Sequence, residues 1–186
     1  MLISAFQKST LLDYPGKLAC LVFTYGCNLR CEYCHNPELV IQPFRKNMAV
    51  SEEEIFFFLK KRKSLIDGVV ITGGEPTLQK DLIPFIKKIK NMGFLAKLDT
   101  NGTNSKVVKK ILDLDIVDYW AMDVKYEKEI YIQNLKDKIG YDEIETVSYT
   151  HLRAHEAVLD LVCRLLLDNK KRSLITRSMS NNVAPT

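Results

Sequence analysis

The sequence has no apolar segment long enough to cross a bilayer. Its longest apolar runs, residues 18–23 and 55–59, fall far short of the roughly 20 residues that a membrane helix needs. The chain does not open on a basic region followed by a long apolar stretch, so we see no signal peptide. We therefore expect a cytoplasmic protein with no membrane partner.

The sequence also lacks the basic stripe that binding to a nucleic-acid backbone requires. The net charge is +4, and residues 147–186 contribute six basic and three acidic side chains to it. The other 146 residues carry 21 basic and 20 acidic side chains and are nearly neutral. Because phosphate backbones are bound by concentrated positive charge, we expect no nucleic-acid partner.

Three of the five cysteines, Cys27, Cys31 and Cys34, fall within eight residues. In a chain without an export signal, this spacing indicates metal or redox chemistry rather than disulfides. A 4Fe–4S cluster normally takes four cysteines, so three leave one iron open to a small ligand with an amine and a carboxylate. The alternative is a zinc site completed by His35 or Cys20. Zinc is typically held by paired ligand dyads, and Cys20 lies in an apolar run where cysteine is usually a core residue.

Apolar runs of strand length alternate with helical patterns over residues 1–146. The strands are predicted at 18–24, 69–72, 94–99 and 116–124, and the helices at 51–62, 80–92, 106–114 and 127–138. This alternation predicts an α/β fold with a parallel sheet. Polar motifs begin at Gly73, Asp99 and Asp123, where three of these strands end. They should converge on the edge where α/β barrels and sheets place active sites.

The segment FTYGCNLRCEYCHNP at 23–37 resembles the signature of the radical S-adenosylmethionine (SAM) superfamily, CxxxCxΦC with an aromatic residue at Tyr33. The flanking HNP at 35–37 and LDYPGK at 12–17 are similar to glycyl-radical-enzyme activases. Among these, the pattern is most similar to activases of anaerobic ribonucleoside-triphosphate reductase, which are related to pyruvate formate-lyase activases. The resemblance covers roughly residues 1–146 and implies a partial (β/α) barrel.

The resemblance implies an oxidoreductase with two cofactors, a 4Fe–4S cluster on Cys27, Cys31 and Cys34, and SAM. Reductive cleavage of SAM would provide a radical that takes a hydrogen atom from a glycine of a partner enzyme. The implied partner is an anaerobic ribonucleotide reductase, and the implied electron donor is of the flavodoxin or ferredoxin type.

The resemblance also implies which residues contact SAM. Tyr33 and the backbone of His35 would contact the adenine, and Gly73, Gly74 and Glu75 the amino group. Asp99 would organise polar groups nearby, and the motif containing Val124 and Lys125 would reach the carboxylate. Without the resemblance, Tyr33 would be interpreted as a core aromatic residue and Lys125 as a surface lysine. The motifs that begin at Gly73 and Asp99 would be interpreted as tight turns.

Residues 147–186 differ from the rest of the chain. They contain no glycine, end in a basic polar stretch and show no alternation of strands and helices. We interpret them as an atypical tail that is not the natural continuation of the fold. The fold then stops after about four βα units, whereas a full radical SAM core has six.

Two alternatives for function stay open. One is a radical SAM enzyme for a small molecule, similar to 7-carboxy-7-deazaguanine synthase, and the other is a non-catalytic metal-binding module.

Overall fold

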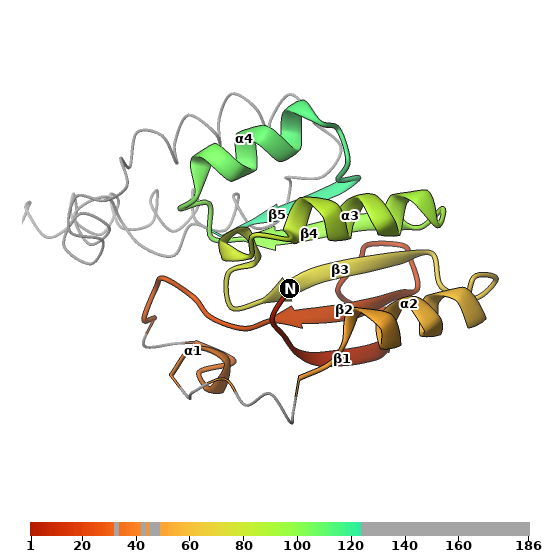
Figure 1. Cartoon of the computed structure of the whole chain (residues 1–186), viewed down its shortest axis with the longest axis horizontal. Helices are drawn as coiled ribbons and strands as arrows, with labels where there is room; N and C mark the ends of the chain where they lie inside the picture. The colour runs from red at the N-terminus through yellow and green to blue at the C-terminus, as the bar shows by residue number, and fades with distance from the viewer. Residues whose placement is uncertain (32–33, 42–43, 45–48, 124–186) are drawn as a thin grey trace, which may run out of the picture.

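The computed structural model describes residues 1–31, 34–41, 44 and 49–123 of the chain (Figure 1). Five strands form one sheet in the order β1-β2-β3-β4-β5. Their bounds are β1 Ile3–Thr10, β2 Ala19–Thr24, β3 Gly68–Gly73, β4 Leu95–Thr100 and β5 Tyr119–Met122. Strands β2 to β5 are parallel, and β1 runs antiparallel to β2. The predicted α/β class with a parallel sheet, as in a partial radical SAM barrel, is confirmed.

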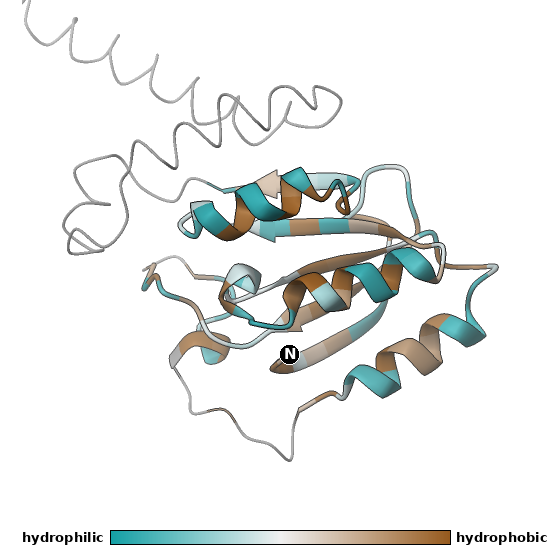
Figure 2. Cartoon of the chain, turned by 45° about the horizontal axis from the view of Figure 1, so that its top comes forward, coloured by the Kyte–Doolittle hydropathy of each residue, from teal (hydrophilic) through white to brown (hydrophobic). Residues whose placement is uncertain are grey.

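The helices α2, α3 and α4 cover one face of this sheet (Figure 1). The helical segments are α1 Glu38–Ile41, α2 Glu52–Lys61, the 3₁₀ segment η2 Pro76–Leu78, α3 Leu82–Asn91 and α4 Ser105–Asp113. Apolar and polar positions alternate along α3 and α4, as Figure 2 shows, and the buried positions are apolar apart from Ser105. None of the described helices combines the length and apolarity needed to span a membrane. The predicted helix at 127–138 and the tail lie outside the described residues.

The start of α2 and the end of α3 show the capping interactions that are typical of serine and glycine at these positions. The Ser51 hydroxyl accepts a hydrogen bond from the Glu54 backbone N–H at 3.1 Å, which satisfies an otherwise unpaired donor of the first turn of α2. Gly93 follows α3 with φ +87°, and its N–H donates to the Lys90 carbonyl at 2.9 Å. The next N–H, of Phe94, donates to the Ile89 carbonyl, so the helix ends in a Schellman motif.

The main core lies between the sheet and the three helices. It contains Cys20 and Trp120, which are 0% and 7% exposed, and the expectation that Cys20 is a core residue is confirmed. On the opposite face, a smaller cluster joins Leu21 and Val70 to Tyr14, whose ring lies 5.5 Å from that of Tyr119. Tyr14 comes from the turn between β1 and β2, so a loop supplies part of the cover on the face that the described helices leave open.

Strand β1 is not predicted by the sequence analysis. Only Ile3 and Thr10, at the two ends of this strand, are buried. The polar residues between them leave no apolar run that would predict a strand. The strand forms because it pairs with the edge of β2, from Ile3 opposite Thr24 to Thr10 opposite Ala19. This pairing satisfies backbone groups of β2 that would otherwise form an open edge.

Candidate functional site

The carboxyl ends of the parallel strands border a cavity of about 410 Å³. Register places these ends together, because Thr24 of β2 pairs with Gly73 of β3 and Thr100 of β4 pairs with Met122 of β5. The predicted site residues that line the cavity are Cys27, Cys31, Cys34, His35, Gly73, Gly74 and Asp99. The predicted residues Tyr33, Val124 and Lys125 lie outside the described residues.

The cysteine loop leaves β2 through Gly26 and packs directly on the turn that follows β3. The Gly26 carbonyl accepts a hydrogen bond from the Glu75 N–H at 2.8 Å. A Cβ atom on Gly74 would lie 2.1 Å from the Gly26 oxygen, so a side chain at position 74 would push the two segments apart. Gly73 has φ +113°, a conformation that residues with a side chain rarely adopt. Both glycines therefore allow the close approach that forms this wall of the cavity.

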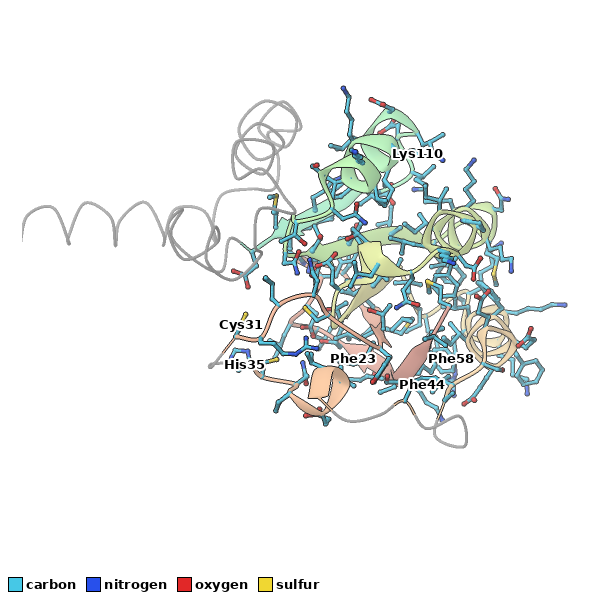
Figure 3. The ribbon with its side chains drawn as sticks, turned by 60° about the vertical axis from the view of Figure 1, so that its left-hand side comes forward. Phe23, Cys31, His35, Phe44, Phe58 and Lys110 are labelled. Carbon is cyan, nitrogen blue, oxygen red and sulfur yellow. The ribbon has the colours of Figure 1, made fainter. Side chains whose placement is uncertain are left out.

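The three cysteines are half-buried around the cavity, and Figure 3 shows Cys31 on the same side of the molecule as His35. The Cys27 sulfur accepts hydrogen bonds from the Leu29 N–H at 3.4 Å and from the Asn101 side-chain amide at 3.7 Å. Burial raises the pKa of the Cys27 thiol, and the Leu29 N–H acts in the opposite direction. A cationic metal centre bound to this sulfur would offset the desolvation of its thiolate.

The donor set fits an iron–sulfur cluster better than a single zinc ion. Among the described residues, no three Cys, His, Asp or Glu side chains are close enough together to hold one metal ion. A 4Fe–4S cluster binds each cysteine at a different iron, so its ligands surround a larger body. Cys20 is fully buried in the core, and burial raises its pKa to about 12, so it is not available as a fourth ligand.

Glu75 lies behind the cavity wall rather than on it. Its side chain has no exposed surface, and it is not among the residues that line the cavity. The carboxylate accepts hydrogen bonds from the backbone N–H of Thr77 at 3.0 Å and of Asn101 at 2.7 Å, and from the Thr100 hydroxyl at 2.7 Å. Burial raises the pKa of Glu75, whereas these donors favour the ionised form. Through these hydrogen bonds, the Glu75 carboxylate joins the segment after β3 to the end of β4.

A buried lysine that the sequence analysis missed lies on the same wall. Lys97 lines the cavity with Asp99, and the two side chains form an ion pair with exposures of 8% and 29%. Burial raises the pKa of Asp99, and the Lys97 ammonium acts in the opposite direction. The signal that could have identified Lys97 is its spacing, because residues two apart on a strand share one face.

The comparisons with known proteins identify the family of this chain. The family model described as the radical SAM superfamily matches residues 21–162, which include the cysteine loop, most of β2 and strands β3 to β5. The chain belongs to the radical SAM superfamily. Proteins of this superfamily use a 4Fe–4S cluster and SAM, so the two predicted cofactors are confirmed for the family.

Several proteins of similar sequence are named as activating enzymes of glycyl-radical enzymes or of pyruvate formate-lyase. The chain is 37% identical over 147 residues to a protein of Methanocaldococcus jannaschii named as a glycyl-radical enzyme activating enzyme, covering 77% of this chain and 58% of that protein. It is 34% identical over 149 residues to the pyruvate formate-lyase-activating enzyme of Clostridium pasteurianum, covering 76% of this chain and 60% of that enzyme. The chain thus spans less than two thirds of the length of these curated relatives.

One solved structure shows a weaker likeness. The crystal structure of QueE from Escherichia coli is 23% identical, with a TM-score of 0.43, and the match covers 55% of this chain and 52% of QueE. A likeness of this size supports no conclusion about function.

Proposed function

We propose that the protein is a radical SAM activase that acts in the cytoplasm and generates a glycyl radical on a partner enzyme. We further propose that the partner is an anaerobic ribonucleoside-triphosphate reductase and that a flavodoxin- or ferredoxin-type protein supplies the electron. The supporting observation is the convergence of the cysteine loop with Gly73, Gly74 and Asp99 on one cavity. The names of the similar activating enzymes favour a protein partner over a small molecule.

In this proposal Cys27, Cys31 and Cys34 hold the 4Fe–4S cluster and leave one iron for SAM. When bound, the cluster and SAM supply the one-electron chemistry that removes a hydrogen atom from the partner's glycine. The chain's own residues orient SAM beside the cluster and keep competing water away.

Two parts of the cavity wall are suited to the methionine end of SAM. The exposed part of the Asp99 carboxylate can accept hydrogen bonds, and the ion pair with the Lys97 ammonium favours its ionised form and restricts its position. The backbone at Gly73 and Gly74 is free of side chains and can approach an amino group closely. Tyr33, His35, Val124 and Lys125 stay predicted contacts for the adenine and carboxylate. Because the Glu75 carboxylate faces inward, we assign it the support of this wall rather than contact with SAM.

The proposal is tested by reconstituting the chain with iron and sulfide without oxygen and then adding dithionite and SAM. We expect about four irons per chain, as a 4Fe–4S cluster requires, and formation of 5′-deoxyadenosine. Cys27→Ala should abolish both results because it removes a cluster ligand. The matched control is Cys20→Ala, which removes a cysteine from the core and should retain the cluster.

The choice of partner requires a second measurement. Adding an anaerobic ribonucleotide reductase should produce a glycyl radical that electron paramagnetic resonance detects. Production of 5′-deoxyadenosine only with a small-molecule substrate, and no radical on the reductase, would contradict the activase proposal. Zinc in place of iron after purification without oxygen would contradict the radical SAM assignment of the site itself.

A further inference from the structure

We propose that Asn101 is a positioning residue that raises the reduction potential of the cluster through a hydrogen bond to Cys27. This inference rests on the proposed function, because it requires the cluster to be bound by Cys27. Asn101 lies directly after β4 and is 6% exposed, and its side-chain nitrogen lies 3.7 Å from the Cys27 sulfur. The contact joins two segments that are 74 residues apart in the chain.

The orientation of the Asn101 amide follows from the groups around it. Its side-chain oxygen accepts hydrogen bonds from the Thr103 backbone N–H at 3.0 Å and from the Thr103 hydroxyl at 2.6 Å. A backbone N–H can only donate, so the group facing it must be the oxygen of the amide. The NH₂ group is therefore the one that points toward Cys27 and toward the Asn28 side-chain oxygen, 3.1 Å away.

Hydrogen bonds to neighbouring segments also fix the position of Asn101. Its backbone N–H donates to the buried Glu75 carboxylate at 2.7 Å, which anchors the residue to the end of β3. Asn28, the residue after Cys27, donates from its own side chain to the Thr103 hydroxyl at 2.8 Å. The cysteine loop and the end of β4 are thus held together by side-chain amides. A donor fixed in this way needs no rearrangement when the charge on the sulfur changes.

A fixed N–H donor affects the two redox states of a cluster differently. The reduced cluster carries one more electron, part of which resides on the cysteine sulfurs, so a donor stabilises the reduced state more strongly. Hydrogen bonds to the sulfurs are among the factors that set the potentials of iron–sulfur clusters. Loss of the Asn101 donor should therefore lower the potential and make the cluster harder to reduce.

The test is a redox titration of the reconstituted full chain, followed by electron paramagnetic resonance. Asn101→Asp retains the size and the oxygen that Thr103 bonds, but it replaces the donor with an oxygen that repels the thiolate. We expect its reduction equilibrium to fall about tenfold, which is about 59 mV for a one-electron couple. Thr103→Val leaves the Asn101 donor in place but removes the hydroxyl that orients it, so we expect a smaller shift in the same direction.

Asn104→Ala is the matched control, because its side-chain amide lies in the same loop and donates to the Thr77 carbonyl at 2.9 Å instead of to a sulfur. Its potential should equal that of the wild type. Equal potentials in wild type, Asn101→Asp and Thr103→Val would overturn the inference while leaving the proposed function intact. An equal shift in Asn104→Ala would also overturn it, because the effect would then be a general loosening of the loop. Absence of a cluster from the wild type would overturn the proposed function, and this inference with it.

Discussion

Gly74→Ala should disrupt the cysteine loop through a steric conflict alone. The added Cβ would lie 2.1 Å from the Gly26 oxygen and 2.6 Å from the Gly26 carbonyl carbon. A close carbon–oxygen contact is about 3.3–3.6 Å, so the two backbones must separate by roughly 1 Å. Overpacking of this kind costs about 1–3 kcal/mol. Separation also lengthens the hydrogen bond between the Glu75 N–H and the Gly26 carbonyl, which is 2.8 Å long.

Gly93→Ala should also destabilise the protein, but through backbone conformation instead of a steric conflict. Gly93 has φ +87° and open space around it, with the flexible Lys63 side chain at 3.9 Å. Its substitution should cost about 1–2 kcal/mol through backbone conformation alone. Guanidinium unfolding followed by circular dichroism should show both variants destabilised. Iron content after reconstitution should fall only in Gly74→Ala, because only this residue touches the cysteine loop. A Gly74→Ala protein with wild-type stability and iron content would refute the steric reasoning.

Three further predictions concern stability. Glu75→Gln should lower the free energy of unfolding by about 1–3 kcal/mol, because the amide NH₂ would face a backbone N–H; an unchanged denaturant midpoint would contradict it. Stability should fall as pH rises from 9 toward about 12, because the Cys20 thiol ionises near 9.0 when unfolded and near 12 when folded. Cys20→Ala should show a shallower decline in alkaline denaturant titrations, and an equally steep one would exclude Cys20 as a source. Ser51→Ala should cost about 1 kcal/mol by removing the N-cap of α2, whereas the exposed Glu53→Ala should change the unfolding midpoint little.

Local patterns in the sequence predicted most of the described elements. The apolar runs of β2 and β3 are buried almost throughout, so their composition marks them as central strands whatever lies around them. The start of α2 at Ser51 and the end of α3 at Gly93 depend on hydrogen bonds between near neighbours. Strand β5 begins later than predicted, at Tyr119 rather than at 116, because Asp118 bonds to the Ala96 N–H through its side chain.

The sequence by itself determined the cysteine spacing, the glycine pair after β3 and the alternation of strands and helices. These features are local, and each forms within a few residues of its neighbours. The tertiary structure decided the inward position of Glu75, the burial of Lys97 and the contact of Asn101 with Cys27. These depend on which strand ends lie side by side and on which face each side chain occupies. Sheet register sets both, because it joins segments that are far apart in the chain.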